Sequence, residues 1–448
     1  MIPLLIASSD RLQAADTTWD GGGEDNFWQT SANWDGNAPP SANDLLFFTG
    51  TSRLDNTNNF TAGTTFRGIT FNNPAGAFVL RGSQIALGGG ITNNQVVTLQ
   101  TINLPLALSA SRSVDVVTDA SLTVGGVVSG AGSGMVKTGG GRLTLGAVNT
   151  FSGTVTINGG TLSVVADLNL GAAPASPTPR KIVLDGGALE TPSTFTLNAS
   201  RGIAVGPSSV TGSGRLIVAP GTTLTYLGAI ANNGAGTGGL TKGGFGAFTL
   251  AGANAYTGPT SNRVGTLFLD FSQATAPASD MISGSSRLSL GGENAGIGTV
   301  NTIQLAMNSK GSGTSSQTFN GTFVDLGGSL IRVTNSPGGT TVLNLGTITP
   351  GSGGAVTFIT PTIGGGSGSI KTTSTNLNGI LGGWATISGA GQTVNSIVVA
   401  TNWASVNSSG DIVPYMRLQR RFPKAGCDSM SGQGQVGTES RLQAARTG

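Results

Sequence analysis

The sequence predicts an all-β protein of the β-solenoid type, and three observations carry this prediction. The chain of 448 residues contains 74 Gly and only 10% charged residues. Short runs of apolar residues and Thr alternate with a period of two between Gly, Asn or Ser, which predicts short strands joined by tight turns. A segment that begins at residue 134 also recurs at residue 239. Repeated short strands bury their apolar faces by stacking on one another.

Chain length favours a fold that grows in one direction. A single compact core stops growing near ~250–300 residues, and an apolar content of 37% is too high for a solvated coil. We expect coils of roughly 20–25 residues, stacked ~4.8 Å apart. A chain of β-sandwiches, with longer strands and turns ~8–12 residues apart, is the alternative.

Residues 1–15 are expected to be the remnant of a signal peptide. A short apolar patch runs from Ile2 to Ala7, and "LQA" before Ala15 is typical of a signal-peptidase site. The basic start and the full apolar core are missing, so we expect the true start upstream. A frayed cytosolic terminus is the alternative.

Residues 16–50 are expected to form an aromatic cap over the first coil. They hold Trp19, Trp28 and Trp34, and a solenoid end must be covered because it exposes backbone and core. The alternative is a carbohydrate-binding module, which requires exposed, coplanar indoles that stack on sugars. Trp384 and Trp403 are expected to pack in the last coils.

Residues 51–415 are predicted to form the solenoid, with the two repeats at 134–162 and 239–267. Each repeat is predicted to contain three strands and two turns. The repeat positions expected to have structural roles are Gly134, Lys137, Gly139, Gly141, Leu145, Asn149, Phe151, Gly153, Gly160 and Leu162, and in the second copy Gly239, Lys242, Gly244, Gly246, Leu250, Asn254, Tyr256, Gly258, Gly265 and Leu267.

Each conspicuous residue type in the repeat has an expected role. Glycine is expected to provide positive φ at the turns. Asn149 and Asn254 are expected in left-handed turns rather than in an internal ladder. The aromatic rings of Phe151 and Tyr256 are expected in the core. The lysines, Lys137 and Lys242, are expected to be solvated beside a turn, with a structural role because they recur.

The two repeats resemble the autotransporter-associated β-strand repeat, of the pattern G-x-L-x-K-x-G-x-G-x-L-x-L-x-x-x-N-x-[FY]-[ST]-G-x-x-x-x-x-x-G-x-L. Phe248 replaces one Leu of this pattern. The segments at 18–48 and 381–415 are similar to parts of repeat-bearing surface proteins of planctomycete-type bacteria. The resemblance implies a right-handed parallel β-helix in an exported passenger, and it implies little about activity.

Residues 416–448 differ from the rest of the chain. They lack a strand rhythm and contain six basic residues and two acidic ones, so they account for more than the whole net charge of +3. We expect this segment to be a disordered basic tail, which either belongs to the protein or comes from a non-native reading frame. The body has no basic footprint for nucleic acid.

Several kinds of chemistry are disfavoured by composition. The chain has no His and a single Cys, Cys427, so no His/Cys metal cluster, Ser–His–acid triad or disulfide framework is expected. No apolar run approaches the ~20 residues of a membrane helix. The run "GAGTGG" at 234–239 precedes a predicted strand, not a helix, so it is interpreted as a turn and not as a nucleotide site. We expect no cofactor.

A polysaccharide lyase or hydrolase on the same scaffold is the enzymatic alternative. Such chemistry needs clustered carboxylates on neighbouring coils. Asp115 and Asp119 are candidates for one face, and Asp185 for a position one coil from Asp167. The other acidic residues between 56 and 410 are Glu190, Asp270, Asp280, Glu293 and Asp325.

Together these observations predict a non-enzymatic, exported β-solenoid at the cell surface, acting as a spacer or adhesin. Its long faces of Thr, Ser and Asn are expected to contact polysaccharide, extracellular matrix or a neighbouring cell surface by many weak contacts.

Overall fold

The computed structural model describes residues 16–292, 303–360, 368–388, 393–394, 397–398 and 402–415. The described residues belong to one compact unit. The expected signal remnant at 1–15, Glu293 and the expected basic tail at 416–448 lie outside the described residues. The described part consists of β-strands, turns and three short 3-10 helices, η1 (Ser31–Asn33), η2 (Asp35–Asn37) and η3 (Asp167–Leu170), which confirms the all-β class.

Most strands belong to three long sheets, called A, B and D here, and two smaller sheets, C and F. Sheet A contains β1 (Asp16–Trp19), β2 (Leu45–Gly50), β5 (Gly68–Ala75), β8 (Ile91–Asn93), β11 (Arg112–Val116), β14 (Met135–Thr138), β16 (Val155–Ile157), β18 (Thr178–Leu184), β21 (Arg201–Val205) and β24 (Ile230–Asn232). Sheet B contains β3 (Asp55–Asn58), β6 (Val79–Gly82), β9 (Gln100–Ile102), β12 (Ser121–Val124), β15 (Arg142–Leu145), β17 (Thr161–Val164), β19 (Ala188–Thr191), β22 (Gly212–Val218), β25 (Gly238–Gly243), β27 (Thr260–Asn262), β29 (Leu288–Leu290), β32 (Thr322–Val324) and β35 (Ile348–Pro350).

Sheet D contains β20 (Phe195–Leu197), β23 (Thr223–Tyr226), β26 (Ala247–Leu250), β28 (Gly265–Asp270), β30 (Ile303–Asn308), β33 (Gly327–Val333), β36 (Gly354–Ile359), β38 (Ala385–Ser388), β41 (Asn402–Val406) and β42 (Ile412–Pro414). Sheet C contains β4 (Thr64–Phe66), β7 (Ile85–Leu87), β10 (Leu106–Leu108) and β13 (Val128–Ser129), and sheet F contains β31 (Gly313–Thr318), β34 (Gly339–Asn344) and β37 (Ser369–Lys371). A two-stranded ribbon joins β39 (Thr393–Val394) and β40 (Ile397–Val398).

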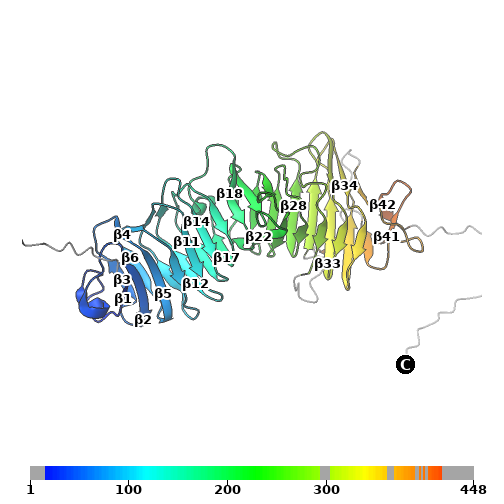
Figure 1. Ribbon diagram of the computed structural model, residues 1–448. Coiled ribbons are helices and arrows are strands. Elements are labelled where there is room, and N and C mark those ends of the chain that lie inside the picture. Colours follow the sequence, from blue (N-terminus) through cyan, green and yellow to red (C-terminus); the bar gives the residue numbers. More distant parts are fainter. Residues whose placement is uncertain are drawn as a thin grey trace, which may run out of the picture. The chain divides into compact units, whose positions relative to one another are not determined.

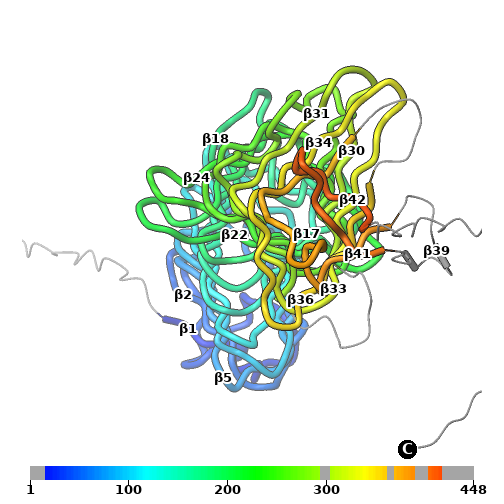
Figure 2. The backbone as a smooth tube through the Cα atoms, turned by 90° about the vertical axis from the view of Figure 1, so that its right-hand side faces the viewer, coloured from blue at the N-terminus to red at the C-terminus, as the bar shows by residue number. Residues whose placement is uncertain are grey.

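Successive coils pair in parallel, which confirms the predicted β-solenoid. A complete coil passes through A, then B, then C or D, some coils contain strands of only two of these sheets, and F replaces A in the last coils. In sheet B, β3 begins at Asp55 and β35 begins at Ile348, twelve coils later, which gives about 24 residues per coil. Figure 1 shows the strands following one another in chain order, and Figure 2 views the coils after a 90° turn. Parallel pairing between successive coils excludes the β-sandwich alternative.

The core consists of inward-facing rows in which each residue lies over its counterpart in the next coil. In sheet B, one row contains Leu122, Leu143, Leu162, Leu189 and Leu216 in consecutive coils. All five side chains are at most 1% exposed. Strand pairing determines which side chains meet in the core. A change of register between coils would therefore also disrupt the core packing.

The two repeats occupy different faces of the solenoid. The first copy forms β14 to β17, which alternate between sheets A and B, whereas the second forms β25 to β28, which alternate between sheets B and D. Each copy therefore contains four strands in two stacked coils, and the prediction of three strands was wrong. In each of its two coils, the repeat specifies two consecutive strands and the corner between them. The same pattern can occupy either sheets A and B or sheets B and D.

The aromatic residues at the start of the unit pack into the core behind the first coils. Trp19, Trp28 and Trp34 are all 0% exposed, and β1 is the end strand of sheet A. The Trp34 ring meets the Trp19 ring at 89° and the Trp28 ring at 88°. Each indole N–H donates to an internal acceptor: Trp28 to Asn56 Oδ1 at 2.7 Å and Trp34 to the Trp28 carbonyl at 2.6 Å. This arrangement is that of the predicted cap.

The prediction for the two C-terminal tryptophans was only partly correct. Trp384 is partly buried and packs against the core, but Trp403 is 47% exposed. The reason is that β41 pairs with β38 in antiparallel orientation and is followed by the antiparallel β42. This reversal ends the coil stacking, so a residue there has no further coil above it.

We expect Trp34→Ala to lower the free energy of unfolding by about 3–5 kcal/mol, because a fully buried large aromatic is replaced by a cavity. Trp403→Ala is the matched control, and its effect should be below about 1 kcal/mol because the ring is half exposed. Denaturant titrations followed by circular dichroism measure both. Equal losses for the two variants would contradict the cap.

Candidate functional site

The repeat lysines occupy inward-facing positions of the core rows. Lys137 lies between Val114 and Ile157 in sheet A, and Lys242 follows Leu216 in sheet B. Their exposed fractions are 0% and 1%. The expectation of solvated lysines was therefore wrong: each aliphatic stem takes the place of a core Leu, Ile or Val, and the amino group reaches the end of the strand.

Both amino groups donate hydrogen bonds to backbone carbonyls at the corners of adjacent coils. Lys137 Nζ lies 2.5 Å from the Thr138 oxygen, 2.9 Å from that of Gly139 and 3.4 Å from that of Gly159 in the next coil. In the second repeat, Lys242 Nζ donates to the carbonyls of Gly244, Gly246 and Val264 at 2.5–2.6 Å. A primary ammonium has three donors, so one lysine connects three corner carbonyls of adjacent coils, of which the Gly246 oxygen also accepts from the Thr266 amide at 3.2 Å.

Burial changes the proton affinity of Lys137. Removal from water lowers the pKa of Lys137 to about 8, while the carboxylate of Asp115 acts in the opposite direction. Asp115 itself accepts a hydrogen bond from Thr138 Oγ1 at 2.8 Å. Its carboxylate is therefore engaged in supporting the corner.

The glycines of the repeat are of two kinds. Gly160 and Gly265 adopt φ of +60° and +73°, as expected for turns. A Cβ on Gly265 would also lie 2.2 Å from Lys242 Nζ, so this glycine leaves space for the amino group. Gly153 and Gly258 have ordinary φ, but a Cβ there would lie 2.3 or 2.5 Å from backbone of the preceding coil. The expectation that turns alone explain the glycines was incomplete, because close approach of coils requires the second kind.

The repeat asparagines connect three consecutive coils. Asn149 Oδ1 accepts from the Val128 amide of the preceding coil at 2.8 Å, and its Nδ2 donates to the Asn169 carbonyl of the next coil at 2.6 Å. Asn254 similarly accepts from Ile230 and donates to Met281. Neither asparagine has a positive φ, so the expected left-handed turn was wrong. These side chains instead bridge coils from inside.

The remaining repeat positions lie in the core. Phe151 and Tyr256 are 0% exposed, and burial raises the pKa of Tyr256. Its hydroxyl lies 2.7 Å from Thr260 Oγ1. The repeat leucines, which are Leu145, Leu162, Leu250 and Leu267, are also 0% exposed.

The tryptophan cluster does not present a sugar-stacking surface. That alternative requires exposed and coplanar rings, whereas Trp28 and Trp34 are fully buried and nearly perpendicular. The structure therefore overturns the carbohydrate-binding hypothesis for Trp19, Trp28 and Trp34.

The carboxylates suggested for catalysis have separate structural settings. Asp167 forms an ion pair with the fully buried Arg201, whose Nε lies 2.8 Å from its Oδ1. The same guanidinium donates to the carbonyls of Leu170 and Gly171, so it holds the η3 segment against the next coil. Asp119 is exposed in a turn at φ +66°. Among the described residues, no group of three or more His, Cys, Asp or Glu has the geometry to hold a metal ion.

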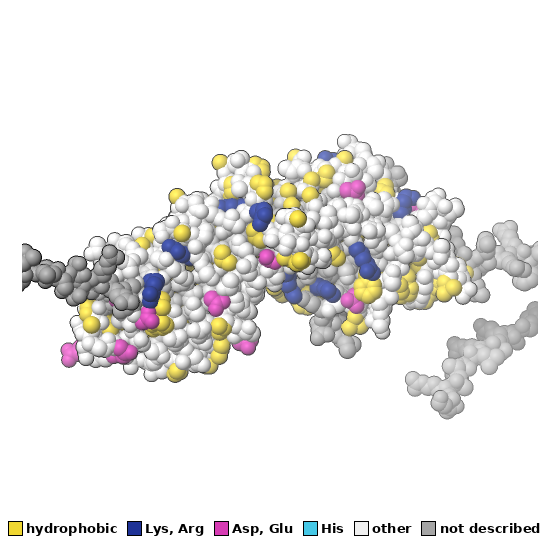
Figure 3. Space-filling view, viewed as in Figure 1, with side chains coloured by type: hydrophobic (Ala, Val, Ile, Leu, Met, Phe, Trp, Pro, Cys, Tyr) yellow, Lys and Arg dark blue, Asp and Glu magenta, His cyan; other side chains and the backbone are white. Residues whose placement is uncertain are grey.

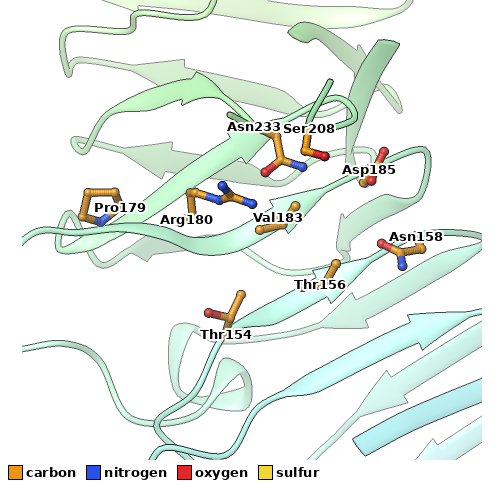
Figure 4. Close-up of a pocket in the computed structure, with 9 residues that line it drawn as sticks. All are labelled: Thr154, Thr156, Asn158, Pro179, Arg180, Val183, Asp185, Ser208 and Asn233. Atoms are coloured by element: carbon orange, nitrogen blue, oxygen red, sulfur yellow. The ribbon is translucent and has the colours of Figure 1, made fainter. Parts of the chain in front are cut away.

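Asp185 lies in a different place, a polar cleft on the outer face of sheet A (Figure 4). The cleft has a volume of about 390 Å³. It is lined by Thr154, Thr156, Asn158, Pro179, Arg180, Val183, Asp185, Ser208 and Asn233. These residues come from β16 and β18, from the residues next to them, and from the segments that follow β21 and β24, so the cleft crosses four coils.

The outer surface is otherwise sparse in charge, and Figure 3 shows isolated basic and acidic side chains on one face. Uncharged rows such as Thr101, Thr123 and Thr144 follow sheet B from coil to coil. The run at 234–239 joins β24 to β25, a strand, as its interpretation as a turn requires. Within the described ranges, no helix is long and apolar enough to cross a membrane.

We expect Lys137 to make a pH-dependent contribution to stability. Because folding lowers the pKa of Lys137 from 10.5 to about 8, the unfolded chain binds more protons between these values. The contribution of Lys137 to the free energy of unfolding therefore increases as the pH rises from 8 towards 10.5. Below pH 8 this contribution is lower and constant. The slope is about 1.4 kcal/mol per pH unit at most.

Denaturant titrations of the wild type and Lys137→Met between pH 7 and 10 measure this contribution as a difference. Lys310→Met is the control, because Lys310 is only half-buried. A wild-type minus Lys137→Met difference that stays constant over this range would contradict the buried amino group.

Comparisons with known proteins agree with this geometry. The family model described as passenger-associated-transport-repeat matches residues 135–164 and 240–267, which contain both lysine corners. The chain is also 33% identical over 318 residues to the adhesin BmaC autotransporter of Brucella suis biovar 1 (strain 1330). That alignment covers 67% of this chain and 8% of the relative, so the chain spans a small part of the relative's length. No solved structure shows significant similarity.

The matched segments coincide with the strands, corners and inter-coil bridges described above. The chain is therefore an autotransporter-associated repeat protein whose two repeats build adjacent coils of a parallel β-solenoid.

Proposed function

We propose that this chain is a section of an exported, non-enzymatic passenger that acts at the cell surface as an adhesin and spacer. The observation that carries the proposal is the similarity to an autotransporter adhesin over 318 residues. The architecture supports it, because continuous sheets transmit force along the stack while their outward rows remain available for contact.

The outward faces suit adhesion by many weak contacts. Rows of Thr hydroxyls repeat from coil to coil, as in Thr101, Thr123 and Thr144 of sheet B. Hydroxyls both donate and accept hydrogen bonds, so such rows match polysaccharides and the polar surfaces of matrix proteins. Repetition along one surface raises the total affinity through avidity.

Beads coated with the full chain test the proposal. We expect retention under flow on at least one surface coated with matrix protein or polysaccharide, increasing more steeply than linearly with protein density because contacts act together. Albumin-coated beads are the control. Absence of retention on every coating would contradict adhesion, and new reducing or unsaturated ends in the polysaccharide would favour the enzymatic alternative. Location of the native protein solely in the cytosol would contradict export.

A further inference from the structure

We propose that the polar cleft over β16 and β18 binds a hexuronate unit of an acidic polysaccharide through Arg180, Asp185 and Asn233. The proposal deepens the adhesive function and rests on it for the choice of a surface polymer as ligand. It assigns a defined carbohydrate site to a protein in which Trp19, Trp28 and Trp34 do not form one.

A bulge in β18 builds the cleft. The pairing of β18 with β21 aligns Thr178 with Arg201 and Ile182 with Ile203, so three residues of β18 lie opposite a single residue of β21. Bulges re-aim side chains on a sheet. Lys181, in the bulge, is 4% exposed and donates to the carbonyls of Ser152 and Gly153 in the preceding coil. These hydrogen bonds to the preceding coil hold the bulge in place.

Arg180 is held over the cleft by an unusual backbone conformation. Its φ is +57°, a region that an L-residue other than Gly, Asn or Asp adopts at a cost. Figure 4 shows its side chain extending along the cleft. Among the described residues, its guanidinium has no hydrogen-bond or ion-pair partner, and Asp185 likewise has none for its carboxylate. Costly backbone geometry that presents an unpaired guanidinium is typical of a binding site.

Asn233 provides the second, independent observation. Its side chain is 3% exposed, and its Oδ1 is buried without a hydrogen-bond donor. The amide lies at the cleft beside Ser208 (Figure 4). A buried acceptor without a donor is unfavourable, so a ligand hydroxyl that donates to this oxygen removes a defect already present in the free protein.

The charges in the cleft select the ligand class. One guanidinium pairs with one carboxylate through two parallel hydrogen bonds, whereas Asp185 and Asn233 Oδ1 require donors. A hexuronate carries both a single carboxylate and several hydroxyls. A polyanion such as nucleic acid or a heavily sulfated glycan is disfavoured, because Asp185 offsets the positive charge of Arg180 in the cleft.

An adjacent depression continues the surface for a polymer. It has a volume of about 180 Å³, shares Thr154 with the cleft, and is lined in part by Ala172, Ala173 and Pro174. Sugar rings have an apolar face as well as polar edges, so a neighbouring sugar unit fits this small apolar surface. The two depressions together accept a short stretch of chain rather than a single enclosed molecule.

Binding of polygalacturonate to the immobilised full chain on a biosensor tests the proposal. We expect binding by the wild type and at least tenfold weaker binding of the fully methyl-esterified polymer. Arg180→Asn should weaken binding at least tenfold, and Asn is compatible with the positive φ. Arg53→Asn is the matched control, because Arg53 is also an arginine with positive φ, at +47°, and its loss changes the net charge equally.

Asn233→Leu separates a ligand contact from a structural role. This variant leaves the charge unchanged, so non-specific attraction to the basic residues 416–448 cannot explain its effect. We expect at least threefold weaker binding with an equal or higher melting temperature, because an unsatisfied buried oxygen is removed. Absent wild-type binding, equal binding of the esterified polymer, equal affinities of Arg180→Asn and Arg53→Asn, or unchanged affinity of Asn233→Leu would each overturn the site. Bead retention on other surfaces would leave the adhesive function standing.

Discussion

In-register parallel stacking of successive coils is the constraint on which the rest of this structure depends. Strand hydrogen bonds satisfy the sheets, whereas backbone carbonyl oxygens of adjacent coils converge at the corners, and buried polar groups must be paired. Lys137 and Lys242 meet this need with three donors each, from inside the stack. Asn149 and Asn254 do the same for amides and carbonyls of neighbouring coils. Glycine is required where these groups and adjacent backbones come close.

The sequence was sufficient to predict the fold, because alternation and an internal repeat report directly on strands and stacking. It was misleading for the lysines, because charge normally indicates exposure. A signal was nevertheless present: Lys137 lies two residues after Met135, and Lys242 two residues after Leu240. Residues two apart in a strand point to the same face, so each lysine is expected on the same inward face as the apolar residue before it. Partial exposure of Trp403 was not predictable, since it depends on the antiparallel ending of the stack.

The different roles of inward-facing and outward-facing side chains connect the fold to its proposed function. Buried lysines and asparagines hold the coils together, so outward residues are free to vary and to make contacts. The polar cleft arises where β18 departs from regular pairing. Arg180 and Asp185 come from β18 and the residue after it, whereas Asn233 follows β24 two coils later, and stacking brings them to one face. No local sequence pattern predicts such a site.

Amide hydrogen exchange in Lys242→Met tests the central account most directly, because it reads each coil separately. Loss of the amino group should remove protection at the amides of 243–247 and, in the next coil, of 264–266, while distant strands of sheet B such as β12 keep theirs. Loss confined to one coil, or unchanged exchange at both corners, would contradict the view that buried lysines hold neighbouring coils together.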